Sequence, residues 1–121
     1  MKLGEIKNAS VALMKIAQKE LPIRIAYKFN KIVDIIDKEM DTLEKFRIKL
    51  VEKHGETNNN GETRVPQEKF EDFQKEYNEL LDTTVSIDVI KFPLSMFEEC
   101  DIKMSIKDIN SLDIVGFIEE D

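Results

Sequence analysis

The chain has 121 residues, enough for one domain with a modest core and too few for two domains. Hydrophobic residues make up 41% and charged residues 36%, a balance typical of a folded domain with a large surface relative to its core. The net charge of −7 repels phosphate backbones and anionic lipid surfaces, so nucleic acid and membranes are disfavoured as partners.

The sequence features that report on cellular location all favour the cytoplasm. Cys100 is the only cysteine, so no internal disulfide can form and a reducing compartment is expected. No apolar run approaches the roughly 18 residues that a membrane span requires. Residues 1–7 carry charges where a secretory signal would need an apolar run. We therefore expect a cytoplasmic protein.

The first predicted helix covers residues 8–19, with Asn8 or Ser10 as its capping residue. Its apolar residues recur at helical spacing: Val11, Leu13, Met14, Ile16 and Ala17. Pro22 lacks an amide proton and restricts the residue before it, so this helix is expected to end ahead of the proline. Because proline is favoured at the first position of a helix, a second helix is expected to begin at Pro22.

The second predicted helix, residues 22–53, is the strongest structural signal in the chain, since no glycine and no further proline interrupts it. Apolar residues occupy the a and d positions of a heptad pattern, with Glu39 as the one polar exception. They are Ile25, Phe29, Ile32, Ile36, Leu43, Phe46 and Leu50. Ala26, Val33 and Met40 widen this stripe, which favours packing against several neighbours over a strict two-stranded coiled coil.

A polar turn over residues 54–65 and a third helix over 66–81 follow. Gly55 is expected to end the long helix in a left-handed conformation, and Asn60-Gly61 favours a short two-stranded ribbon. The apolar face of the third helix consists of Phe70, Phe73, Tyr77, Leu80 and Leu81. A short connection between two amphipathic helices predicts an antiparallel helical hairpin.

The last part of the chain predicts a strand over residues 84–91 and a helix over 105–119. Hydrophobic and polar residues alternate across the first segment, as in a half-buried strand that Phe92-Pro93 would end. A strand cannot stand alone, and residues 1–6, the region around Lys103 or a second chain could pair with it. Residues 94–99 predict a helical turn, and Ser105 predicts a cap for the final helix.

The predicted fold class is therefore mainly α with a minor β part, in a single domain covering residues 1–121. It consists of a long antiparallel helical hairpin, a short N-terminal helix and a small C-terminal strand-plus-helix element. The first half of the long helix extends beyond its shorter hairpin partner. The short first helix is expected to cover only part of this apolar stripe, and we expect the uncovered remainder to drive self-association, most simply as a dimer. The stripe comprises Ile25, Phe29, Ile32 and Ile36.

Six short segments carry a resemblance to known proteins. They are Leu-Pro-Ile-Arg-Ile-Ala-Tyr-Lys (21–28), Lys-Leu-Val-Glu-Lys-His-Gly (49–55), the polar turn (56–63), Phe-Gln-Lys-Glu-Tyr-Asn-Glu-Leu-Leu (73–81), Val-Ser-Ile-Asp-Val (85–89) and Phe-Ile-Glu-Glu (117–120). Together they resemble, in order along nearly the whole chain, an uncharacterised family of small proteins encoded by phages and prophages of Gram-positive bacteria. The resemblance implies a phage origin, and the family supplies no activity and no catalytic residues to transfer.

No combination of residues predicts catalysis, a metal site or a cofactor. His54 is the only histidine, no nucleophile stands at a motif spacing from it, and its place near a helix C-terminus is favourable in itself. The acidic neighbours of Cys100 disfavour a reactive thiolate. The acidic clusters at 98–101 and 119–121 lack the ligand spacing of a calcium loop. We therefore expect a protein that is not an enzyme.

Basic residues on the long helix form the one candidate binding site. Arg24, Lys31, Lys38 and Lys45 recur every seven residues. Arg24, Tyr27, Lys28 and Lys31 lie near the helix N-terminus, where free amides and the helix dipole attract anions. This site would suit an acidic protein surface or a nucleotide. The alternative is that these lysines and arginines form an ordinary solvated face.

Three functional hypotheses remain open from the sequence. The first is a non-enzymatic phage or prophage accessory protein that binds a host or phage macromolecule in the host cytoplasm, for example as an inhibitor of host defence. The second is a structural or assembly component of the virion. The third is a protein that sequesters a nucleotide signal.

Overall fold

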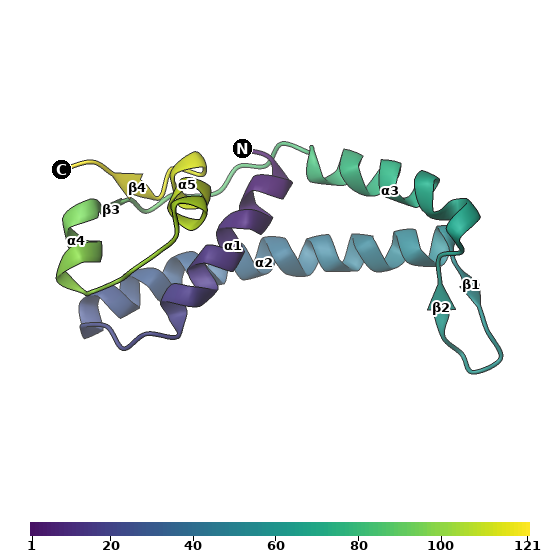
Figure 1. Ribbon diagram of the computed structural model, residues 1–121, viewed down its shortest axis with the longest axis horizontal. Helices are drawn as coiled ribbons and strands as arrows, with labels where there is room; N and C mark the ends of the chain where they lie inside the picture. Colours follow the sequence, from purple (N-terminus) through teal and green to yellow (C-terminus); the bar gives the residue numbers. More distant parts are fainter.

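Five helices and four short strands make up the chain, and the computed structural model describes all of residues 1–121 (Figure 1). The elements are α1 (Leu3–Ala17), α2 (Ile23–His54), β1 (Glu56–Thr57), β2 (Thr63–Arg64), α3 (Gln67–Leu81), β3 (Phe92–Pro93), α4 (Leu94–Glu99), α5 (Ile106–Ile114) and β4 (Ile118–Glu119). Helices account for 64% of the residues, which confirms the predicted class, mainly α with a minor β part. None of the helices is both long enough and apolar enough to cross a membrane.

The helix α2 forms the long axis of the molecule, and α3 returns along its second half (Figure 1). The 32 residues of α2 follow the heptad pattern and lie within one residue of the predicted bounds at each end. The connection between α2 and α3 contains the antiparallel ribbon of β1 and β2, with Thr57 opposite Thr63. The predicted long helix, antiparallel hairpin and ribbon are therefore confirmed.

The conformation predicted for Gly55 is wrong, although glycine is required at this position. Its backbone is extended (φ −92°, ψ 167°) and not left-handed. A Cβ atom at this residue would lie 2.3 Å from the carbonyl oxygen of Val51 and 2.8 Å from the Thr63 methyl group. Glycine is therefore needed because a side chain here would clash first with the last turn of α2 and then with the adjacent strand β2. The left-handed glycine of the connection is Gly61 (φ +79°).

The first helix begins earlier than predicted, at Leu3 and not at residue 8. The Glu5 carboxylate accepts a hydrogen bond of 2.8 Å from the backbone N–H of Lys2, which satisfies a free amide at the true start of the helix. Ser10 lies inside α1 and its hydroxyl donates to the Lys7 carbonyl, so neither Asn8 nor Ser10 is a cap. The helix ends at Ala17, ahead of Pro22 as expected.

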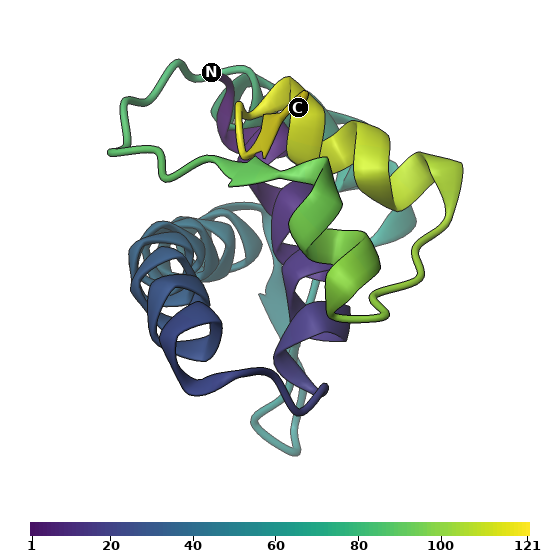
Figure 2. The same cartoon turned by 90° about the vertical axis from the view of Figure 1, so that its left-hand side faces the viewer.

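The core lies around the first half of α2, where α1 packs against both α2 and α5 (Figure 2). Phe29, Ile32 and Ile36 of α2 are only 5%, 1% and 2% exposed. The expectation that this half of the stripe is partly uncovered is therefore wrong. The reason is that α1 and the C-terminal elements together cover what α3 does not reach. The buried residues that cover it include Ile6, Leu13, Ile16, Phe92, Phe97, Leu112 and Phe117.

The predicted strand at residues 84–91 is not formed. Thr84 makes an isolated bridge with Lys2, and the Val85 N–H donates to the Met1 carbonyl at 2.8 Å. Beyond these contacts the segment forms no ladder with another strand. The alternating pattern reflects half-buried apolar side chains on an extended segment, among them Val85 and Ile87. Of the pairing partners considered, the N-terminal residues supply the only contact.

Phe92-Pro93, expected to end that strand, is itself β3 and pairs in parallel with β4. The Phe92 N–H donates to the Phe117 carbonyl at 2.9 Å. The last helix is also shorter than the predicted range of 105–119, because it ends at Ile114 and Gly116 turns the chain with a positive φ of +83°. Ser105 caps α5 as expected, since its hydroxyl accepts a hydrogen bond from the Asp108 N–H.

Candidate binding surface on the long helix

The four residues predicted as a site gather at the start of α2. Arg24, Tyr27, Lys28 and Lys31 are separated by three or four positions, so they lie on one side of the helix. Together with Ile23 and Ile90 they line an open hollow of about 530 Å³. Arg24, Tyr27, Lys28 and Lys31, with Ile23, are called the basic end of α2 below.

Apolar side chains at the basic end are unusually exposed. Ile23 is 83% exposed and Tyr27 is 62% exposed, although both belong to a helix whose inner face is well buried. The Lys31 ammonium lies 4.8 Å from the centroid of the Tyr27 ring, within the range of a cation–π interaction. The surface therefore combines exposed apolar side chains with cations in one hollow.

The cations of the basic end have no anionic partner. The ion pairs of the molecule involve other residues, and none includes Arg24, Lys28 or Lys31. The first turn of α2 contains no acidic residue, and Pro22 supplies no side-chain cap. Positive charge and helix dipole are thus both uncompensated at this end of the helix.

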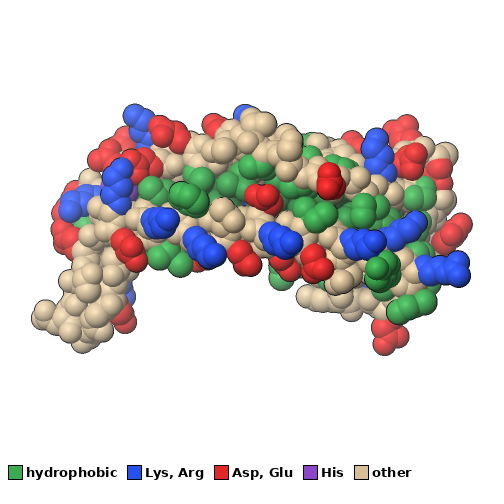
Figure 3. Space-filling model, turned by 180° about the vertical axis from the view of Figure 1, so that it is seen from behind, with side chains coloured by type: hydrophobic (Ala, Val, Ile, Leu, Met, Phe, Trp, Pro, Cys, Tyr) green, Lys and Arg blue, Asp and Glu red, His purple; other side chains and the backbone are tan.

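The basic side chains continue beyond this end. Figure 3 shows a row of lysine and arginine side chains along the length of one face, beside a band of apolar side chains. Lys38 and Lys45, predicted to extend the seven-residue repeat, are exposed and do not line the hollow of the basic end. The structure therefore separates a local cluster at the start of α2 from a longer solvated row.

His54 has a structural environment at the far end of the hairpin. Its Nε2 atom lies 2.8 Å from Glu76, and the same carboxylate accepts a hydrogen bond of 2.6 Å from Lys53. These two hydrogen bonds hold the pKa of Glu76 below its ordinary value, and the hydrogen bond from Lys53 has the larger effect. The His54 ring packs edge-on against Phe73. His54 therefore joins the end of α2 to α3.

The other singled-out residues do not converge on a site. Cys100 is a half-buried residue at the end of α4, and its N–H donates to the Met96 carbonyl. The Asp121 carboxylate accepts a hydrogen bond of 3.2 Å from the Ser95 N–H, close to the start of α4. No three histidine, cysteine, aspartate or glutamate side chains are grouped so that they could hold a metal ion.

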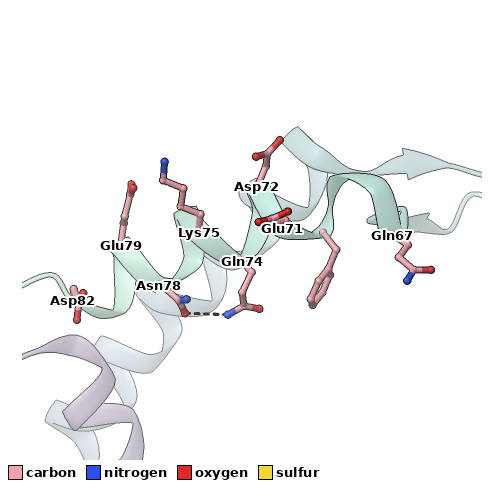
Figure 4. Close-up of a pocket in the computed structure, with 9 residues that line it drawn as sticks. Gln67, Glu71, Asp72, Gln74, Lys75, Asn78, Glu79 and Asp82 are labelled. Carbon is pink, nitrogen blue, oxygen red and sulfur yellow. Dashed lines mark hydrogen bonds between the residues drawn. The ribbon is translucent and has the colours of Figure 1, made fainter.

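A larger hollow, about 970 Å³, runs along α3 (Figure 4). All its lining residues belong to α3, apart from Asp82, which directly follows the helix. In Figure 4 Asp72, Lys75 and Glu79 point away from Gln74 and Asn78, which hydrogen-bond to each other at 3.0 Å. With no second element opposite and no convergent groups, this hollow is the outer face of a helix.

Comparison with known proteins gives no match, since no protein-family model, curated protein or solved structure is similar to the chain. The resemblance to phage-encoded proteins stays a prediction.

Helical spacing was sufficient to place the four predicted residues together. Ile23 and Ile90 were not predicted as part of the site. An isoleucine directly after a helix-starting proline, one position before Arg24, was the available signal for Ile23. Nothing in the sequence placed Ile90 beside it.

Proposed function

We propose that the protein is a non-enzymatic accessory factor, of phage or prophage origin, that binds an acidic surface of a partner protein in the host cytoplasm. The basic end of α2 is the surface that would make the contact. One observation carries the proposal: three cations without an ion-pair partner line the same hollow as two strongly exposed apolar side chains, Ile23 and Tyr27.

An ordinary solvated face accounts for the lysines, but not for two exposed apolar side chains, Ile23 and Tyr27, that line the same hollow. Solvated helix faces carry charged and polar residues, whereas protein interfaces combine an aromatic or aliphatic centre with a charged rim. Arginine and tyrosine are among the residues that contribute most to protein binding energy. Arg24 and Tyr27 adjoin Ile23 in this arrangement, which favours a partner that offers both carboxylates and apolar surface.

The chemistry of the surface favours a protein over nucleic acid or a nucleotide. The net charge of −7 opposes every anionic partner, and most of all the closely spaced phosphates of nucleic acid. Small-molecule sites bury most of their ligand, whereas the walls here are formed by side chains that are 62% and 83% exposed. A broad partner surface covers such side chains better than a single nucleotide does.

The test compares two double variants with the same change in charge. Arg24→Glu with Lys28→Glu alters the basic end, and Lys38→Glu with Lys45→Glu alters the solvated row. The wild-type protein would be used to capture and identify its partner from host cells, and the affinity of each variant for that partner would then be measured. Loss of two charge-assisted contacts at about 1.5–3 kcal/mol each weakens binding about 10² to 10⁴-fold.

The proposal requires that only the first variant loses binding. Equal weakening by both variants would assign the effect to long-range charge. Unchanged binding by the first variant would show that the basic end is not the contact surface. Retention of a nucleotide by the purified protein, lost in the first variant alone, would favour the alternative in which the protein sequesters a nucleotide signal.

A further inference from the structure

The second half of the hairpin is incompletely covered. The helix α3 has an apolar side, yet none of its 15 residues is buried. Phe46 of α2 is 46% exposed and Phe70 of α3 is 50% exposed. In this half of α2 only Leu43 is buried. Two helices alone cannot enclose their own apolar stripes, so this half of the molecule lacks a further packing layer.

An open groove of about 380 Å³ lies between α2 and α3. Its apolar residues are Phe46, Leu50 and Leu80. One edge carries Lys49 and Lys53 from α2, and the other carries Glu76, Glu79 and Thr83 from α3 and the residues just after it. This set of residues is called the hairpin groove. Figure 3 shows that such an apolar band, bordered by basic side chains, runs along the rod.

The two edges of the hairpin groove have opposite charge. Lys53 and Glu76 form an ion pair of 2.6 Å across it within the same chain. Lys49 and Glu79 form no ion pair; Lys49 instead lies 4.9 Å above the Phe46 ring. Each copy therefore presents one unpaired cation on its α2 edge and one unpaired anion on its α3 edge.

We infer that a second copy of this chain covers the hairpin groove. In a two-fold dimer the same patch contacts itself, so a patch with one basic and one acidic edge can be its own complement. The α2 edge of each copy then faces the α3 edge of the other, with Lys49 opposite Glu79 in two equivalent places. Two hairpins joined in this way form a four-helix arrangement, which buries the apolar residues of both.

The charge pattern favours a second copy over an unrelated partner. An acidic partner would match Lys49 and leave Glu79 facing like charge, and a basic partner would do the reverse. The same chain satisfies both edges and also supplies a matching apolar band. This inference is independent of the proposed function, because the basic end lies at the opposite end of α2 and shares no residue with the hairpin groove.

The test uses the single variants Lys49→Glu and Glu79→Lys, an equimolar mixture of the two, and the double variant that combines both changes. The mass of each sample is measured by light scattering and sedimentation over a concentration series. Each single variant places like charges at both contacts and should weaken self-association on the order of tenfold or more. The two single variants mixed together should form a heterodimer, because one chain is then acidic at both positions and the other is basic at both. The combined variant should dimerise as the wild type does.

Lys45→Glu is the matched control, because it makes the same charge change on α2 outside the hairpin groove and should leave the dimer intact. Circular dichroism of each variant establishes that the helices are retained. If the mixture of the two single variants dimerises, the contact between positions 49 and 79 lies between chains. A contact within one chain could not be restored by mixing. A wild-type protein that stays monomeric at every concentration, or single variants whose mixture stays monomeric, would overturn the inference.

Discussion

The ring of Phe29 stacks on the ring of Phe92, with centroids 4.1 Å apart and planes 5° from parallel. Phe97 meets Phe29 edge-on, at 6.4 Å between centroids. Phe29 belongs to α2, whereas Phe92 and Phe97 belong to β3 and α4 near the other end of the chain. This aromatic cluster closes the core over the first half of the long helix, which the hairpin partner α3 does not reach.

Phe92→Ala should therefore lower the free energy of unfolding by about 3–5 kcal/mol, the usual cost of removing a buried phenylalanine side chain. Phe92 is 2% exposed, so the substitution leaves a cavity against Phe29 as well as removing apolar contact. Urea denaturation followed by circular dichroism measures the change. Tyr27→Ala is the matched control, since that ring is 62% exposed and lies outside the hairpin groove. A comparable loss in the two variants would show that the cluster does not dominate the core.

The ion pair between Lys15 and Asp108 predicts a dependence of stability on pH. The Lys15 ammonium lies 2.5 Å from the Asp108 carboxylate and joins α1 to α5. This hydrogen bond is the main reason that the pKa of Asp108 lies below its ordinary value. A carboxyl with a lowered pKa in the folded state contributes stability above its unfolded pKa of about 3.9, and that contribution is lost as the pH falls through the folded value.

Asp108→Asn should consequently be less stable than the wild type at pH 7, and the difference should shrink as the pH falls below about 4. Urea denaturation at a series of pH values tests this. Asp113→Asn, an exposed position on the same helix, should show no such convergence. If the Asp108→Asn deficit is the same at pH 3 and pH 7, the lost contact is not the ionised pair.

Gly55→Ala should destabilise the hairpin turn by about 1–3 kcal/mol, the typical cost of forcing an extra carbon into a filled space. The new Cβ would lie 2.3 Å from the Val51 carbonyl oxygen, so the end of α2 or β2 must move. Thermal unfolding measures the loss. Asn59→Ala, exposed at the tip of the same turn, should change stability by no more than about 0.5 kcal/mol.

The sequence predicted those features that depend on local periodicity. The heptad pattern of α2 and the aromatic face of α3 were enough to predict the hairpin, and helical spacing alone brought Arg24 and Lys28 together. The start of α1 was missed because Lys2 is not a usual capping residue, and the cap depends on the Glu5 side chain reaching back to its amide.

Features that depend on distant neighbours could not be predicted in the same way. The alternation of hydrophobic and polar residues over 84–91 indicated which side chains are half-buried. A β-ladder also needs an adjacent backbone, and only Met1 and Lys2 pair with this segment. Equally, the sequence could not show which half of α2 is covered. That depends on α1 and on Phe92 packing over the first half, which leaves Phe46 and Leu50 in the open groove.

Ile23 offers the sharpest test of the basic end, because the chain contains a matched control. Ile23 is 83% exposed and Ile106, on α5, is 87% exposed. Either residue changed to serine should alter the free energy of unfolding by no more than about 0.5 kcal/mol, since neither side chain is packed. If the basic end contacts a partner, however, Ile23 belongs to that contact and Ile106 lies outside it.

Ile23→Ser should therefore weaken partner binding by about 2 kcal/mol, roughly thirtyfold, and Ile106→Ser should leave it unchanged. The apolar contribution should also persist as salt is raised, whereas that of Arg24 and Lys28 should decline through screening. Titration calorimetry at two salt concentrations distinguishes the two contributions. Equal affinities for the two serine variants would mean that Ile23 remains in solvent when the partner binds, and the contact would have to be sought elsewhere on the molecule.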